Sequence, residues 1–290
     1  MVEKPGEGLT KEQVDFYQRE GYLVLPSLLS AEELNPTKEA MNDKVSMIAN
    51  ELFKDGLIKD RLIDRPFERR LAELFKDLTE KDFLKYGVSW RDRHPGYFHL
   101  MSHPKILDVV ESLIGGEIFS NPLYNTRPKI PKVAAGAVPW HQDKSYWPGA
   151  KSNPVITVWI PIVDANEING CLHIKPKTHR KRLLEWHREQ DTGAGYTALR
   201  ENQLGNTPSV VLPVKAGSAI VFNDRCLHMS TPNHSEEVRW SVDLRYQPTD
   251  QDPMTDRGIG FLARSRKHTE RVATLEDWLA NRPEHLDESS

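Results

Sequence analysis

Two histidines and an aspartate in this chain have the residue types and the order of a metal-ligand set. His141 and Asp143 flank Gln142, and His228 follows 85 residues after Asp143. On an extended strand, side chains two residues apart leave the same face, so His141 and Asp143 can point to one place. Two imidazoles and one carboxylate are the ligand set of non-haem Fe(II) oxygenases. The sequence therefore predicts an iron site to which a distant segment contributes His228, expected just past the end of the strand over residues 219–222.

An arginine stands at a short interval beyond the second histidine. Arg239 comes eleven residues after His228 and lies in residues 238–246, where apolar and polar residues alternate. Arg239 and Ser241 share the polar face, and a guanidinium beside a hydroxyl makes a good clamp for a carboxylate. Periodicity alone favours the alternative, an ordinary polar sheet face on which Arg239 pairs with Asp243 or another neighbour.

Helix-forming patterns dominate the part of the chain that precedes these residues. Two segments begin with a capping residue, and apolar residues at helical spacing indicate one buried face. The expected helices are residues 11–20, a long segment after Ser30, residues 66–86 and the segment from His103-Pro104 to Ile114, with a short strand over residues 22–26.

From about residue 117 the pattern changes to short β-branched runs separated by Pro, Gly and Asn. Strands are expected over residues 155–163, 209–214, 219–222 and 238–246. Residues 155–163 are apolar on both faces, which is typical of a strand buried on both sides. Thr157 and Trp159 would then face an enclosed space.

The sequence has no linker between the helical and the β part. We therefore expect a single domain over residues 1–290, with a helical buttress of about residues 1–116 and a β core of about residues 117–250. Residues 251–290 are expected to form a polar C-terminal extension. Residues 180–208 break the strand rhythm, and such irregular segments are either binding lids or surface connections.

Composition limits the classes of partner and compartment. A net charge of -3 gives no general affinity for nucleic acid or for an anionic membrane. The two cysteines, Cys171 and Cys226, lack the CxxC spacing and do not make a disulfide framework. The chain begins without the apolar segment of a signal peptide, and no run approaches 18 apolar residues. We expect a cytoplasmic protein, a monomer or a homodimer, that binds neither nucleic acid nor membrane.

Together these features give a resemblance to a known family. The chain resembles the phytanoyl-CoA dioxygenase-like family of Fe(II)/2-oxoglutarate-dependent oxygenases. The resemblance runs from Gly21-Tyr22-Leu23-Val24-Leu25 to about Arg245. It rests on His141-Gln142-Asp143, Trp159, Asn169-Gly170-Cys171-Leu172, Pro176-Lys177-Thr178-His179, and His228 with Arg239.

The resemblance implies a fold and a set of roles. The fold would be mainly β with flanking helices, a double-stranded β-helix (a jelly-roll or cupin-like barrel) that N-terminal helices buttress. His141, Asp143 and His228 match the iron ligands of the family and would be the catalytic centre. The residues that would hold 2-oxoglutarate are Arg239, Ser241, Trp159, Leu123 and Asn125. A lysine contact that some relatives make has no counterpart near Tyr86 to Trp90.

The implied activity is hydroxylation of an unactivated C–H bond in a small organic molecule. Fe(II), 2-oxoglutarate and O2 would take part, and succinate and CO2 would be released. Related halogenases replace the carboxylate ligand with a small residue, so Asp143 favours hydroxylation, with desaturation or epoxidation as variants. Two alternatives are a non-catalytic member that binds metal or 2-oxoglutarate, and a cupin-type isomerase, which would not need Arg239.

The substrate itself is not specified by these motifs. Tyr146, Trp147, Trp90 and Phe98 are aromatic candidates for the wall of a substrate pocket, although aromatic residues often serve only core packing. Arg91, Arg93 and Lys144 could attract an acidic substrate, or they could simply be solvated. His173, His179 and His234 are more typical of structural or exposed histidines than of metal ligands.

Overall fold

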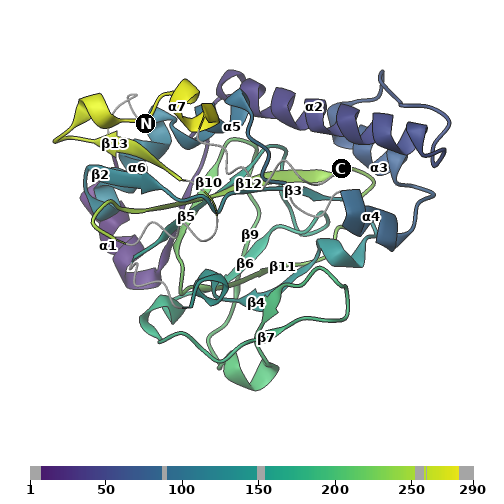
Figure 1. Cartoon of the computed structure of the whole chain (residues 1–290). Coiled ribbons are helices and arrows are strands. Elements are labelled where there is room, and N and C mark those ends of the chain that lie inside the picture. The colour runs from purple at the N-terminus through teal and green to yellow at the C-terminus, as the bar shows by residue number, and fades with distance from the viewer. Residues whose placement is uncertain (1–7, 87–89, 149–153, 252–257, 259, 281–290) are drawn as a thin grey trace.

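The computed structural model describes residues 8–86, 90–148, 154–251, 258 and 260–280. Within these residues the chain forms two main antiparallel sheets, and helices cover the outer face of the larger one (Figure 1). This arrangement confirms the expected mainly β class with flanking helices. The two sheets face each other as in a jelly roll, but the described strands do not join them into a closed barrel.

The larger sheet combines strands from both ends of the chain. In spatial order it contains β1 (Tyr22–Leu25), β10 (Ala219–Asn223), β5 (Ile156–Pro161), β12 (Arg239–Pro248), β2 (Glu117–Ser120) and β13 (Phe261–Ser265). A further strand, β3 (Asn125–Lys129), pairs with the first half of β12, while β2 pairs with its last residues. The long strand β12 therefore holds the sheet together.

The smaller sheet carries the two histidines. Its order is β4 (Val138–His141), β11 (Leu227–Ser230), β6 (Leu172–Lys175) and β9 (Val210–Leu212). A separate two-stranded ribbon, β7 (His187–Arg188) with β8 (Thr197–Ala198), comes from the irregular segment 180–208. Leu199 N–H donates to the carbonyl of Trp140, so this segment lies against the edge of β4.

The first two helices begin where the sequence signals indicate, whereas the helix expected over residues 66–86 is divided into two shorter helices. Thr10 with Gln13, and Ser30 with Glu33, form capping boxes, and Gly21 ends the first helix with a φ of 86°. The helices are α1 (Lys11–Glu20), α2 (Ala31–Lys54), α3 (Phe67–Leu74), α4 (Glu80–Tyr86), α5 (Pro95–Met101), α6 (Pro104–Ile114) and α7 (Leu275–Ala280). Figure 1 shows α2, α5 and α6 on the outer side of the larger sheet.

Strand β12 has two buried faces of opposite character. Trp240, Val242, Leu244 and Tyr246 pack into the main core with the helices. The other face carries Arg239, Ser241, Asp243 and Arg245, and each of these residues is at most 5% exposed. Buried charges must be paired or must meet a ligand, since desolvation disfavours the ionised form. The polar face between the sheets is therefore the place to look for a site.

Two local expectations are corrected by the structure. The strand of the tripeptide ends at His141, and Asp143 begins a short 3-10 helix (Asp143–Tyr146); Gln142 stays extended, so the two side chains still converge. His228 lies within a strand of its own, β11, and not in the loop after β10.

The C-terminal segment contributes more than a polar extension. Within its described part, β13 pairs with β2, and Trp278 of α7 is 2% exposed beside Phe98 and Phe261. Residues 252–257, 259 and 281–290 of that segment lie outside the described residues. The single-domain organisation stays a prediction.

Candidate metal centre

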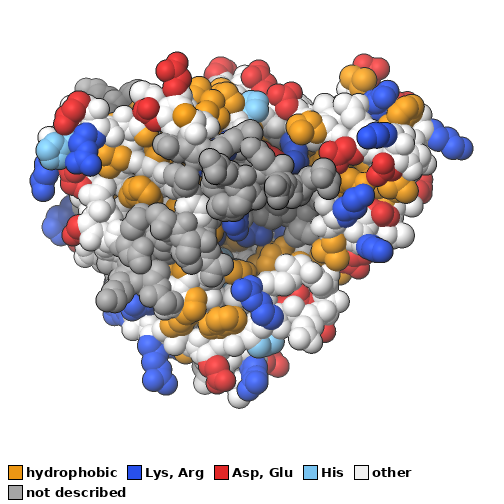
Figure 2. Space-filling model, in the orientation of Figure 1, with side chains coloured by type: hydrophobic (Ala, Val, Ile, Leu, Met, Phe, Trp, Pro, Cys, Tyr) orange, Lys and Arg blue, Asp and Glu red, His pale blue; other side chains and the backbone are white. Residues whose placement is uncertain are grey.

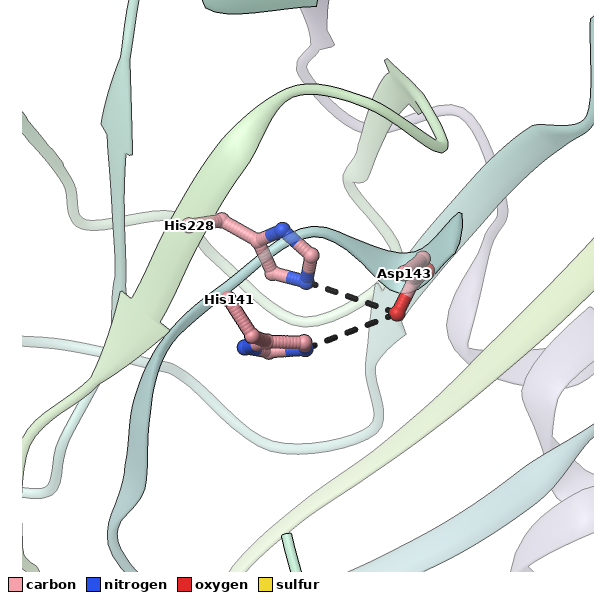
Figure 3. A group of neighbouring side chains, drawn as sticks. All are labelled: His141, Asp143 and His228. Atoms are coloured by element: carbon pink, nitrogen blue, oxygen red, sulfur yellow. Dashed lines mark ion pairs between the residues drawn. The ribbon is translucent and has the colours of Figure 1, made fainter. Parts of the chain in front are cut away.

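The side chains of His141, Asp143 and His228 converge between the sheets (Figure 3). His141 and His228 are direct partners in the pairing of β4 with β11, and their ring centroids are 4.1 Å apart. Asp143 Oδ1 lies 3.5 Å from His141 Nε2 and 3.7 Å from His228 Nε2. The three residues are at most 5% exposed. Among the described residues, this is the one group of three potential His, Cys, Asp or Glu ligands close enough to hold a metal ion.

Both imidazoles are oriented by backbone carbonyls. His141 Nδ1 lies 2.8 Å from the carbonyl oxygen of Pro139, and His228 Nδ1 lies 2.9 Å from that of Cys226. A carbonyl oxygen only accepts, so each Nδ1 must carry the proton and donate it. Each Nε2 then presents a lone pair to the common space, which is the tautomer that a metal ligand requires.

Asp143 is held as a carboxylate by two neighbours. Thr157 Oγ1 donates to Oδ2 at 2.7 Å, and Arg245 Nη2 donates to the same oxygen at 3.1 Å. Burial alone would raise the pKa of Asp143, but the charge of Arg245 lowers that pKa well below its usual value. Burial also lowers the pKa of His228 to about 3, with His141 adding to the effect. One carboxylate and two neutral imidazoles fit a divalent cation.

A buried cationic pocket lies beside these three residues. The inner cavity is lined by His141, Asp143, His228, Trp159, Ser230 and Arg239, among others. Arg239 Nη1 donates to Ser241 Oγ, and its guanidinium lies 5.3 Å from the centre of the Trp159 ring. Its Nε has no partner, and among the described residues no carboxylate contacts it. Burial lowers the pKa of Arg239 to about 10, and Arg127 adds to this. A buried guanidinium without a carboxylate fits an anionic ligand.

Lys129 brings a second buried cation to Arg239. It is the partner of Arg239 in the pairing of β3 with β12, and it is 3% exposed. Its Nζ donates to Ser230 Oγ at 2.7 Å and to the carbonyl of Thr231. Burial lowers the pKa of Lys129 well below its usual value, and the nearby Arg239 and Arg127 lower it further. Arg239 and Lys129 are therefore two adjacent buried cations that form no ion pair with the described residues, and of the two only Arg239 lines the inner cavity.

The family that matches this chain is the phytanoyl-CoA dioxygenase family, whose model covers residues 17–241. The chain belongs to this family. Its members are iron- and 2-oxoglutarate-dependent oxygenases, and this chain has the His-Asp-His site in place. The predictions of the family, of the enzyme class and of iron and 2-oxoglutarate as cofactors with O2 are confirmed.

Individual relatives are distant in sequence but extensive in coverage. A probable phytanoyl-CoA dioxygenase of Caenorhabditis elegans is 26% identical over 257 residues, which are 85% of this chain and 78% of that protein. The solved structure of the non-haem α-ketoglutarate-dependent carbocyclase SnoK from nogalamycin biosynthesis has a TM-score of 0.60 at 23% identity, covering 86% of this chain and 89% of SnoK.

A second solved structure is that of the epimerase SnoN in complex with Fe3+, α-ketoglutarate and nogalamycin RO. Its TM-score is 0.52 at 20% identity, over 82% of this chain and 83% of SnoN. The structural likenesses confirm the jelly-roll fold. They do not fix the reaction, since carbocyclases and epimerases share this fold.

A larger cavity, the outer cavity, opens on the other side of Arg127 and Arg245. Its volume is about 410 Å³, and both arginines line the inner cavity as well. The predicted aromatic residues Trp90, Tyr146 and Trp147 line it, and so do Ala194, Gly195 and Tyr196 of the irregular segment. Residues 180–208 thus contribute a wall of this cavity. The volume suits a small organic molecule.

Several predicted residues do not line the inner cavity, among them Leu123, Asn125, Ser241 and Phe98. Leu123 and Asn125 are on the wall of the outer cavity, so their predicted contact with 2-oxoglutarate stays a prediction. The prediction that Phe98 belongs to the wall of the substrate pocket is corrected. Phe98 packs in the core against Phe261 and Trp278, with ring centroids 5.0 and 5.7 Å apart, because α5 turns it toward α7 and β13. It does not line either cavity in the described part of the chain.

The other histidines and cations have local roles. His179 Nε2 lies 3.2 Å from the carbonyl of Gln18, and neither His179 nor His173 belongs to the group of potential metal ligands. Arg93 contacts the carbonyl of Trp278, and Lys144 is buried near Asp224. Arg91 remains on the wall of the outer cavity. No helix among the described residues is long and apolar enough to cross a membrane.

Several residues of the site were not predicted from the sequence. Ser230 could have been found, because it is two residues after His228 and shares its face of the strand. Lys129 and Arg245 could not, because their roles depend on the pairing of β12 with β3 and on the approach of Asp143.

The backbone at Gly170 makes room for Lys129. Gly170 has a φ of 82°, and a Cβ there would lie 2.3 Å from the carbonyl oxygen of Thr231 and 2.9 Å from Lys129 Cδ. We expect Gly170→Ala to lower the free energy of unfolding by about 2–4 kcal/mol, through backbone strain and overlap together. Gly56→Ala is the matched control, since Gly56 has a φ of 71° and no atom within 4 Å of the added Cβ. Urea unfolding measures both, and equal losses would contradict the role of close packing at Gly170.

Proposed function

We propose that this chain is an Fe(II)/2-oxoglutarate-dependent oxygenase that hydroxylates an unactivated C–H bond of a small organic molecule. The observation that carries the proposal is the convergence of His141 Nε2, His228 Nε2 and Asp143 Oδ1, beside a buried guanidinium that contacts no carboxylate among the described residues. A carboxylate ligand at position 143 favours hydroxylation over halogenation. Desaturation and epoxidation are variants of the same chemistry.

These three atoms would hold the iron. When bound, Fe(II) together with 2-oxoglutarate and O2 supplies the oxidising power for cleavage of a C–H bond, with release of succinate and CO2. The protein's part is to position the cofactor and the substrate and to exclude competing reactions. The carbonyls of Pro139 and Cys226 keep both imidazoles in the ligating tautomer, and Arg245 keeps Asp143 ionised.

The inner cavity would hold 2-oxoglutarate. Arg239 would bind the carboxylate far from the metal through its guanidinium fork, with Ser241 fixing the orientation of the guanidinium. Trp159 would cover the chain of the co-substrate, and Lys129 with Ser230 would add a second charge and a hydroxyl. Leu123 and Asn125 would act from the outer cavity. Because Arg127 and Arg245 line both cavities, a substrate in the outer cavity would face the metal across them.

Formation of succinate from 2-oxoglutarate is the direct test. The protein is incubated with Fe(II), 2-oxoglutarate and O2 across a panel of small organic acids, acyl-CoA thioesters and neutral metabolites, and succinate is measured. Substrate-dependent succinate with a product heavier by one oxygen atom supports hydroxylation, whereas loss of two hydrogens indicates desaturation. Metal-dependent binding of 2-oxoglutarate without any succinate would favour a non-catalytic member. Absence of both would remove the proposal.

The buried amine of Lys129 leads us to expect that the affinity for 2-oxoglutarate depends on pH. The pKa of Lys129 is lowered by burial, and only the protonated amine attracts the co-substrate. We expect the affinity for 2-oxoglutarate to fall as the pH rises through this lowered pKa, by up to about tenfold per pH unit for one linked proton. Lys129→Met should bind more weakly at low pH and lose this pH dependence.

Titration calorimetry of the Fe(II)-loaded protein without O2 measures this dependence. Lys132→Met is the control, because Lys132 is exposed and pairs with the exposed Glu236. A wild-type affinity that is independent of pH, or an unchanged slope in Lys129→Met, would contradict the role of Lys129. Cytoplasmic location and the choice between monomer and homodimer stay predictions of the sequence.

A further inference from the structure

The outer cavity has an excess of positive charge. Five basic side chains line it, and none of its described lining residues is Asp or Glu: Lys44, Lys85, Arg91, Arg127 and Arg245. Figure 2 shows basic side chains at the hollow near the centre of the face in view. Two of the five are paired at the rim, Lys44 with Asp92 at 2.9 Å and Lys85 with Asp55 at 3.6 Å. The remaining three are guanidiniums.

Two buried carboxylates, Asp243 and Asp143, contact two of these three guanidiniums. Asp243 accepts from Arg127 Nε at 2.8 Å and from Arg245 Nη1 at 2.6 Å. Arg245 also binds Asp143, which would be a metal ligand. Arg91 contacts neither carboxylate, and among the described residues it forms no ion pair. A divalent metal and the dianionic co-substrate would cancel each other, so the excess charge would persist in the loaded enzyme.

Arg91 is held in place at the cavity wall. Its Nε donates to Asn125 Oδ1 at 2.9 Å, and Asn125 Nδ2 in turn donates to Asp243 Oδ2 at 2.8 Å. Its backbone follows the antiparallel bridge between Trp90 and Thr126. The residue is exposed to solvent at the cavity wall, and desolvation together with the repulsion by Arg245 and Arg127 lowers the pKa of Arg91. The bond at Nε leaves both Nη groups available as a fork.

We propose that the substrate carries an anionic group, a carboxylate or a phosphate, and that Arg91 binds this group on the wall of the outer cavity. The aromatic residues Trp90, Tyr146 and Trp147 would pack against the organic skeleton of the substrate. A planar fork binds both oxygens of a carboxylate or two oxygens of a phosphate, and so it also orients the molecule. This inference names the substrate class of the proposed oxygenase and rests on that function for its biological meaning.

A pair of probes with the same shape and different charge tests the proposal. We compare 3-phenylpropionate with its neutral amide, 3-phenylpropanamide, by titration calorimetry of the full chain. The Fe(II)-loaded protein is saturated with 2-oxoglutarate in the absence of O2, and the metal-free protein is measured beside it. We expect the acid to bind about tenfold more tightly than the amide, as one charge-assisted contact allows. A third probe, 2-phenylethyl phosphate, distinguishes a phosphate-bearing substrate from a carboxylic acid.

Three variants locate the effect. Arg91→Gln should bring the ratio of the two affinities to about one, and Arg91→Lys should keep part of it, since the charge stays and the fork is lost. Arg93→Gln is the matched control and should keep the ratio, because Arg93 does not line the cavity and contacts the carbonyl of Trp278.

The outcomes separate this inference from the proposed function. Equal affinities in the wild type, or a ratio that Arg91→Gln leaves unchanged, would overturn the role of Arg91. Normal metal-dependent binding of 2-oxoglutarate in that experiment would leave the proposed function intact. A preference for the acid in the metal-free protein supports the anion site without any reference to catalysis.

Discussion

The Asp143→Ala variant is expected to lose at least about a hundredfold in succinate formation. Asp143 would supply the one anionic ligand, and loss of even an outer-shell partner of a metal ligand typically costs about 10–100-fold in metal affinity or activity. The change also leaves Arg245 with a single carboxylate, Asp243, and takes away the acceptor of Thr157. Fe(II) affinity, measured by titration without O2, should fall in parallel with activity.

Two further variants make this result interpretable. Asp143→Asn keeps the size of the side chain and an acceptor for Thr157, so it should fold and still bind Fe(II) weakly. Asp15→Ala removes an exposed carboxylate of α1 that pairs with Lys11, and it should behave as the wild type. If Asp143→Ala hydroxylates as well as its parent, the assignment of the three ligands is wrong.

The Arg239→Gln variant is expected to weaken binding of 2-oxoglutarate by about 30-fold to several thousandfold. Removing one partner of a buried, hydrogen-bonded charge pair costs about 2–5 kcal/mol. The unliganded protein should be at least as stable as the wild type, because the variant removes a buried guanidinium that contacts no carboxylate among the described residues. Weaker binding with unchanged or higher stability separates a ligand contact from a folding defect.

A conservative change and a remote change complete this test. The affinity of Arg239→Lys for 2-oxoglutarate should lie between those of the wild type and of Arg239→Gln, since lysine keeps the charge but lacks the guanidinium fork. Arg19→Gln, on the exposed side of α1, should leave 2-oxoglutarate binding unchanged. Titration of the Fe(II)-loaded proteins measures all four. Wild-type affinity in Arg239→Gln would place the co-substrate elsewhere in the site.

Local sequence signals predict the elements of this fold well and their pairing poorly. The capping residues Thr10 and Ser30 start helices where expected, because a side-chain oxygen meets a free backbone N–H regardless of tertiary context. The alternation of polar and apolar residues over 239–246 likewise predicts a strand with one apolar and one polar face. That β3 and β2 share one edge of β12 could not be predicted, since strand order depends on contacts between distant segments.

For the site, too, local features could be predicted from the sequence and contacts between distant segments could not. Residue type and spacing predicted the convergence of His141, Asp143 and His228, because the chemistry of a ligand is carried by its side chain. The role of Arg239 was predicted only with the family resemblance, since spacing alone favoured an ordinary polar sheet face. The partners that tune these residues were not identified, since they come from other strands. Arg245 reaches Asp143 from β12, and it becomes visible only once β12 and the short helix after β4 are placed together.

The direct pairing of His141 with His228 has a consequence for how this enzyme could diversify. The separation of the two imidazoles is set by hydrogen bonds between neighbouring backbones, and not by the sequence of any loop. Part of the outer wall, by contrast, comes from connecting segments such as residues 194–196. Loops tolerate substitutions and insertions that strands do not. Substrate range can therefore drift through the loops while the oxidising centre stays unchanged, so one scaffold can give rise to many selectivities.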